Sequence, residues 1–63
     1  PFLFKEGERV VLVFVTGGLS IEASGVALQP GVLGSLVNVR NTDTGVVIRG
    51  LVQSNGSVQV GVN

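Results

Sequence analysis

Residues 25–41, GVALQPGVLGSLVNVRN, decide the fold of this 63-residue chain. The pair Pro30-Gly31 predicts a type II turn, because proline presets φ at the first corner position and glycine accepts a positive φ at the second. Gly34 marks a further corner, where a side chain has either no room or no accessible backbone angle. The middle of the chain is therefore expected to turn sharply twice.

The end of the same stretch alternates between apolar and polar residues. Val37 and Val39 fall on one face, whereas Asn38 and Arg40 fall on the other. A period of two is typical of a half-buried strand. No helix is indicated anywhere in the sequence, and glycines separate the predicted strands. The pattern predicts a small all-β domain of short, glycine-cornered strands without a substantial helix.

A hairpin is predicted ahead of this stretch. Residues 10–15, VVLVFV, form a continuous β-branched and aromatic run, which favours a strand buried on both faces. Gly17-Gly18 suits a two-residue hairpin loop. A phosphate-binding loop would need a following helix and usually a lysine, and neither is present here. The pairs that this hairpin predicts are Phe14 with Ile21, Leu12 with Ala23, Val13 with Glu22, and Val15 with Ser20.

Three valines of the first strand face polar residues on the second. Val11, Val13 and Val15, which we call the valine ridge, would form an apolar surface that a soluble monomer rarely leaves bare. We expect the late strands of the same domain to cover the ridge. The alternatives are an upstream domain, a second copy of the chain or a binding partner. The ridge is therefore a candidate partner-binding surface.

The last part of the chain predicts a second hairpin. Gly50 lies inside the strand pattern of residues 46–52, which indicates a bulge or a close backbone approach. A two-residue loop would put Gln59 opposite Val52, whereas a three-residue loop with Gly56 at positive φ keeps apolar residues together, so we favour the latter. The pairs of the favoured register are Val52 with Val58 and Ile48 with Val62.

Composition excludes several classes of function. The chain has no cysteine and no histidine, and its four basic residues balance its four acidic ones. Disulfides and the common zinc sites are therefore excluded, and a nucleic-acid partner is not expected because no basic stripe exists. No apolar run is long enough to span a membrane. The first residues do not resemble a signal peptide, and a start at Pro1 favours a piece of a longer protein.

No catalytic constellation is present in the sequence. The four carboxylates do not form a converging acid–base pair, and no histidine exists to activate a serine. Arg40 and Arg49 lie on predicted neighbouring strands and could bind a carboxylate or a phosphate, although a solvated strand face explains them more simply. We expect a binding module without cofactor, metal or enzymatic activity.

Residues 1–8 are predicted to lead into a single domain at residues 9–63. Phe2 and Phe4 are expected to pack on the core of that domain. The alternative is a linker that docks on an upstream domain.

The glycine spacing closely resembles a known family. A run G-x-A-L-x-x-G-x-x-G is followed by V-R-N and by G-x-V, within residues 5–60. This pattern resembles the C-terminal SAF-type (β-clip) domain of the flagellar basal-body P-ring assembly chaperone family. The sequence departs from the family pattern at Ser35, where an acidic residue is common, and at Val47, where a polar or basic residue is usual. The residues that carry the motif are Gly25, Ala27, Pro30, Gly31, Gly34, Val39, Asn41, Gly50 and Gly56.

The resemblance implies a function in the bacterial periplasm. Proteins of this family escort the P-ring subunit so that it polymerises around the flagellar rod, and further domains precede the one resembled here. Two other β-clip roles stay open: a module of pilus or other envelope assembly, and the lid domain of a sugar-acid synthase. An upstream signal peptide and a second β domain would favour the P-ring role or the envelope-assembly role. An upstream barrel of strands and helices would favour the lid of a sugar-acid synthase.

Overall fold

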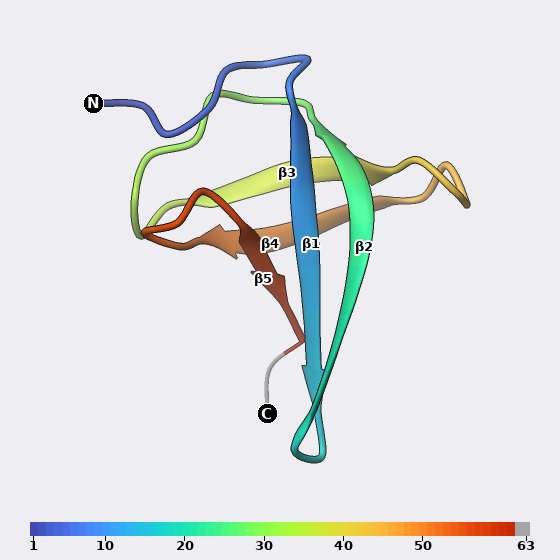
Figure 1. Ribbon diagram of the computed structural model, residues 1–63. Helices are drawn as coiled ribbons and strands as arrows, with labels where there is room; N and C mark the ends of the chain where they lie inside the picture. The colour runs from blue at the N-terminus through green and yellow to red at the C-terminus, as the bar shows by residue number, and fades with distance from the viewer. Residues whose placement is uncertain (62–63) are drawn as a thin grey trace.

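The computed structural model describes residues 1–61 and is all-β, as predicted (Figure 1). The strands are β1 (Arg9–Thr16), β2 (Leu19–Ala27), β3 (Leu36–Asn41), β4 (Val47–Val52) and β5 (Val58–Val60). They form a closed barrel in the order β1-β2-β3-β4-β5, in which β5 returns to pair with β1 in parallel and all other neighbours are antiparallel. Residues 1–61 include no helix long and apolar enough to cross a membrane.

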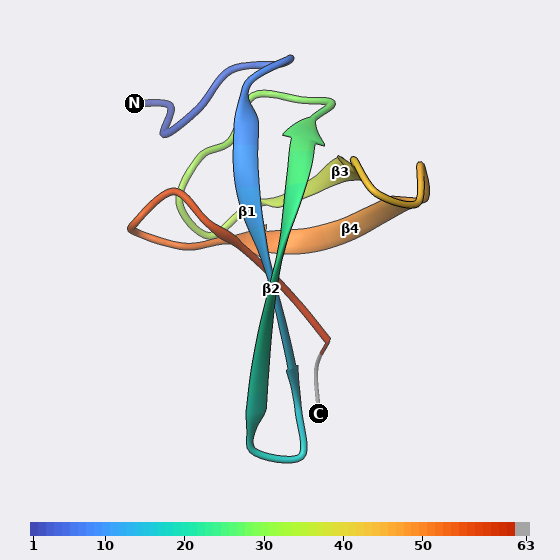
Figure 2. The same ribbon diagram turned by 45° about the vertical axis from the view of Figure 1, so that its right-hand side comes forward.

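The first hairpin has the predicted loop and register. Gly17 and Gly18 both adopt positive φ, at 52° and 84°, which is the requirement of a type I′ turn. The predicted pairs are all present, from Phe14 with Ile21 to Leu12 with Ala23. The turn end of this hairpin projects well beyond the other strands (Figures 1 and 2). We call residues 14–22 the arm.

The strand β2 has different partners along its length. It pairs with β1 from Leu19 to Val26, but with β3 only at Gly25–Ala27. Its first half therefore belongs to the arm, whereas its last half belongs to the barrel wall.

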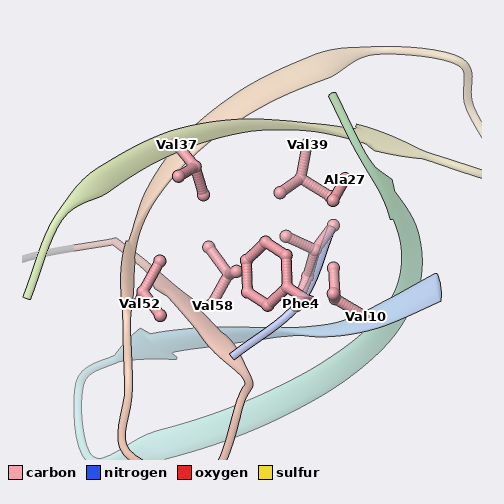
Figure 3. Packing of buried hydrophobic residues seen from close by; sticks show 8 residues of the cluster. Phe4, Val10, Ala27, Val37, Val39, Val52 and Val58 are labelled. Atoms are coloured by element: carbon pink, nitrogen blue, oxygen red, sulfur yellow. The ribbon is translucent and has the colours of Figure 1, made fainter. Parts of the chain in front are cut away.

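The interior of the barrel is a small apolar core. Its buried side chains come from all five strands and from the segment before β1, and Phe4 lies among the valines (Figure 3). The core residues are Phe4, Val10, Leu12, Ala27, Val37, Val39, Val52 and Val58. The predicted alternation in β3 is confirmed, because Val37 and Val39 are buried and Arg40 is exposed.

The strand β1 is buried on one face only, which corrects the expectation of burial on both. Val10 and Leu12 point into the barrel and are buried, whereas Val11 on the opposite face is exposed. A barrel of this size has a single interior, so alternate residues of every strand must face outward. The β-branched run reflects strand propensity on the outer face rather than a second core.

Gly31 does not form the predicted type II turn. Its φ is not positive; instead it forms a bridge with Phe4, and its N–H donates to the carbonyl of Phe4 at 2.9 Å. A Cβ at this position would overlap the Phe4 ring. Glycine is therefore required here for close packing and not for backbone angle.

The segment before β1 is split in its burial. Phe4 is 4% exposed and packs in the core as expected, whereas Phe2 is 65% exposed, so the expectation was wrong for Phe2. Gly7 N–H donates to the carbonyl of Ala27 at 2.8 Å. These contacts attach the first residues to the end of β2.

Gly34 is required for its backbone angle. Its φ is 82° and no atom lies within 4 Å of a Cβ placed there, so a side chain would have room but an unfavourable conformation. In the same turn, Ser35 Oγ donates to the carbonyl of Val32 at 2.7 Å. Ser35, one of the departures from the family pattern, thus stabilises its own turn.

Gly25 and Gly50 mark close approaches of chain to chain. A Cβ at Gly25 would lie 2.5 Å from Val39 Cγ1, and one at Gly50 would lie 2.7 Å from the carbonyl oxygen of Gln59. For Gly50, the close approach that we predicted is confirmed. Both glycines let neighbouring strands approach each other closely, because a side chain at either position would overlap the next strand.

Asn41 closes the β3–β4 turn. Its Oδ1 accepts hydrogen bonds from the N–H groups of Asp43, at 2.8 Å, and Thr44, at 3.2 Å. This is an Asx turn, in which a side chain replaces a backbone carbonyl. Asn41 is also buried, so the V-R-N motif ends in a residue that serves as a structural cap.

The last hairpin has the favoured three-residue loop. Val52 pairs with Val58, Gln53 N–H donates to the carbonyl of Ser57 at 2.8 Å, and Gly56 has a φ of 86°. The second predicted pair, Ile48 with Val62, lies outside the described residues.

Candidate partner-binding surface

The valine ridge lies on the outer face of the barrel. Val11 is 44% exposed, and Val13 and Val15 are half-buried. The late strand β5 lies beside β1, with Val13 paired to Gln59, and does not lie over the ridge. Strand β5 therefore does not provide the expected cover, and the ridge stays partly exposed.

An open groove runs along this ridge. One part, of about 330 Å³, lies between the ridge and the β4–β5 loop, and an adjoining part of about 290 Å³ extends along that loop. Val13, Asn55 and Ser57 line both parts. The other lining residues are Arg9, Val10, Val11, Glu22 and Gly56 in the first part, and Gln53, Ser54 and Gln59 in the second.

The β4–β5 loop, which forms one wall of the groove, is stabilised by hydrogen bonds within the loop. Asn55 Oδ1 accepts from Ser57 N–H at 3.0 Å and from Ser57 Oγ at 2.7 Å. Gly56 N–H donates to the carbonyl of Gln53 at 2.9 Å. This local network and the positive φ of Gly56 fix the loop, so the groove has a preorganised wall.

Arg40 and Arg49 also lie on the outer face, as predicted. Arg49 is opposite Asn38 and Arg40 is opposite Val47 in the β3–β4 ladder, so the two arginines are diagonal neighbours. Both are exposed. Beyond Arg49, Leu36 pairs with Leu51, and both leucines are exposed. This part of the surface mixes positive charge with apolar area.

Arg9 lies between the valine ridge and the arginine pair Arg40 and Arg49 on the outer face. In the ladder it faces Val26, which in turn faces Arg40, so one row of outward positions runs from β1 to β3. Arg9 also lines the groove beside Val11. Arg9 was not among the predicted site residues, although its even spacing from Val11 and Val13 places it on the same face.

The residues of the β4–β5 loop were also missed as part of the site. Gln53, Asn55 and Ser57 were not selected, because the sequence predicted here only a three-residue loop with Gly56 at positive φ. The parallel pairing that brings this loop beside β1 has no local sequence signal. The surface as a whole combines an apolar floor with amide, hydroxyl and guanidinium groups. That combination suits the binding of a polypeptide segment. Residues 1–61 contain no cluster of three or more potential metal-ligating side chains.

Comparison with known families decides the assignment. Residues 1–60 match the family model described as "Chaperone for flagella basal body P-ring formation". The chain belongs to this family. The resemblance carried by the glycine motif is thereby confirmed.

Individual members of the P-ring chaperone family are similar over nearly the whole chain. The "Flagellar protein FlgA" of Rhizobium meliloti (strain 1021) is 42% identical over 59 residues, which are 94% of this chain and 35% of that protein. The "Flagellar protein FlgA" of Agrobacterium fabrum (strain C58) is 43% identical over 60 residues, or 95% of this chain and 37% of that protein. The chain thus spans about a third of the length of these relatives.

Two solved structures share the fold. The closed form of Salmonella FlgA matches with a TM-score of 0.88 at 28% identity, over 97% of this chain and 30% of that one. The open form matches with a TM-score of 0.86 at 27% identity, over 98% of this chain and 30% of that one. The barrel described above is therefore similar to one part of the longer Salmonella FlgA chain.

Proposed function

We propose that this chain is the SAF-type domain of a periplasmic chaperone, and that it binds the flagellar P-ring subunit during ring assembly without catalysing a reaction. The family description, one of P-ring formation, supports the P-ring role. The periplasmic location is part of the proposal and rests on that role. The proposal gives this domain the task of contacting the subunit. Contact with an upstream domain of the same protein is the competing use of the surface.

The observation that carries the proposal is the uncovered valine ridge in its groove. Val11 is 44% exposed, although its neighbours Val10 and Leu12 on the opposite face of β1 are buried. Apolar area of this kind, rimmed by polar groups, is typical of protein-binding sites. Arg40 and Arg49 extend the surface with charges that would orient an acidic segment of the partner.

The ridge can be tested by Val13→Lys. Val13 is half-buried on the outer face, so a lysine can extend its ammonium group into water while its stem lies in the groove. We expect the variant to fold with an unchanged circular dichroism spectrum and to bind purified P-ring subunit at least tenfold more weakly. Surface plasmon resonance with the immobilised subunit measures the change.

A matched control uses another exposed apolar residue. Leu33 is 61% exposed in the loop before β3, away from the groove, and Leu33→Lys should leave binding unchanged. A folded Val13→Lys variant with normal affinity would contradict the ridge as the binding site. If no affinity is measured even for the unmodified chain, the subunit-binding role of this domain itself fails.

A further inference from the structure

The outer edge of β2 in the arm is an open strand edge. On one side β2 pairs with β1 from Leu19 onward, but on the other side its ladder with β3 begins only at Gly25. One further bond extends that ladder, from Thr42 N–H to the carbonyl of Ser24 at 3.1 Å. Residues 19–23 of β2 therefore have no neighbouring strand on this side within residues 1–61.

The hairpin geometry determines which backbone groups this edge offers. In a two-residue hairpin, the residues flanking the loop form a hydrogen-bonded pair, and such pairs then alternate along the ladder. Leu19, Ile21 and Ala23 therefore direct their N–H and C=O groups toward β1. Ser20 and Glu22 direct theirs outward, in the same direction as the carbonyl of Ser24.

The side chains along this edge are strongly exposed. Leu19 and Ile21 are 65% and 55% exposed on one face of the arm, and Ser20 and Glu22 are exposed on the other. An apolar, exposed strand edge is a template for pairing, which proteins usually block with proline, charged side chains (above all lysine) or a bulge. Residues 19–23 contain no proline, lysine or bulge, and Glu22 is their one charged residue.

We propose that the open edge of β2 is a self-association site, at which two copies of the chain pair antiparallel through residues 19–23. A two-fold axis through Ile21 places Ile21 opposite its own copy and Leu19 opposite Ala23 of the second copy. On the other face, Ser20 meets Glu22. The ladder then gains the two outward-facing residues of each copy as hydrogen-bonded pairs.

Charge favours this register over the one centred on Glu22. Centring the axis on Glu22 would oppose two carboxylates, which is destabilising. Centring it on Ile21 opposes no like charges and brings the apolar side chains together. The net charge of the chain is zero, so no overall repulsion separates the copies.

The new strand pair ends just before the ladder with β3. The position opposite Ser24 on this edge is taken by Thr42, whose N–H donates to the carbonyl of Ser24 at 3.1 Å. With the axis through Ile21, Leu19 opposite Ala23 is the last pair at each end, so the second copy pairs only along residues 19–23. The next residue of the second copy, Gly18, has no side chain.

Single cysteines test the register directly, because the chain contains none. At the axis, Ile21 and its copy form a non-hydrogen-bonded pair with Cα atoms about 4.5 Å apart, within the range that a disulfide bridges. Ile21→Cys should form a covalent dimer under mild oxidation at least tenfold faster than Leu19→Cys, whose copies lie four residues out of register. Equal rates would overturn the proposal.

A mixed experiment sharpens the same test. Ser20→Cys and Glu22→Cys should each cross-link poorly alone, because identical positions are offset by two residues. An equal mixture of the two variants should cross-link efficiently, since these positions oppose each other. Both residues are exposed, so the substitutions leave the barrel unchanged. A mixture that reacts no faster than the separate variants would overturn the register.

Association itself is measured by sedimentation velocity over a concentration series. The unmodified chain should shift from monomer to dimer, and Ile21→Lys should remain monomeric because it opposes two ammonium groups at the axis. Leu36→Lys, at a residue 59% exposed on the outer face of β3, should dimerise normally. A chain that stays monomeric at every concentration, with Ile21→Lys weakening only the binding of a partner strand, would overturn self-association in favour of strand addition by that partner.

Discussion

The two halves of the β1–β2 hairpin differ in burial although one ladder runs through both. In the barrel half, Leu12 is fully buried and Gly25 is packed against Val39. In the arm, Ile21 and Leu19 occupy the same face of the ladder and are more than half exposed. Strand pairing is therefore the same in both halves, and the difference comes from the strands β3 to β5, which cover only the barrel half.

This contrast shows that the apolar–polar alternation of a strand predicts on which face a side chain lies, but not whether that side chain is buried. The inward-facing residues of the hairpin read as one apolar stripe in sequence. Closure of a five-strand barrel needs only part of that stripe, and the rest projects as the arm. The excess length is the feature that leaves an open edge on β2.

The largest effect is expected from Leu12→Ala compared with Ile21→Ala. Removing a fully buried leucine side chain leaves a cavity and costs about 2–5 kcal/mol, which is most of the stability of a domain this small. Ile21→Ala should cost less than about 1 kcal/mol. Urea unfolding at a concentration where the chain is monomeric measures both. Equal costs would mean that the arm is as well packed as the barrel.

A smaller effect is expected from Gly25→Ala. The new Cβ would lie 2.5 Å from Val39 Cγ1 and 3.1 Å from the carbonyl oxygen of Arg40. Val39 is fully buried and has little room to move, so the free energy of unfolding should fall by about 1–3 kcal/mol. A neutral substitution would show that the barrel wall adapts at this crossing, contrary to its close packing.

The smallest effect is expected at the tip of the arm, from Gly17→Asn. Gly17 has a φ of 52° with no atom within 4 Å of a Cβ position, and asparagine adopts this left-handed region more readily than other residues with a side chain. The free energy of unfolding should change by less than about 0.5 kcal/mol. Thermal unfolding followed by circular dichroism is the measurement, and a loss similar to that of Gly25→Ala would contradict a tip free of tertiary contacts.

Sequence reasoning succeeded where local rules decide the outcome. The loop Gly17-Gly18 determines the register of the first hairpin, and the left-handed Gly56 determines that of the last one. Both registers depend on a few consecutive residues whose backbone angles have strong preferences. The all-β class followed from the same glycine corners.

Sequence reasoning failed where distant segments decide. Gly31 was predicted from its neighbour Pro30, but its geometry is set by the Phe4 ring, which approaches it from the other end of the chain. The valine ridge was selected because it lies opposite polar residues, but cover by the late strands was expected and Val11 is 44% exposed. Its groove was not foreseen, because the loop around Asn55 reaches it only through the pairing of β5 with β1.

The parallel pairing of β5 with β1 also has a consequence for how the chain folds. Residue 12 contacts residue 58 in that ladder, so the barrel cannot close until nearly the entire chain has been brought together. Long-range closure of this kind costs loop entropy before any packing compensates for it, and it slows folding. Until β5 arrives, β1 and β4 each keep one unsatisfied edge. During folding, the free edges of β1 and β4 are therefore open to wrong pairing for longer than any other edge, until the short strand β5 joins them.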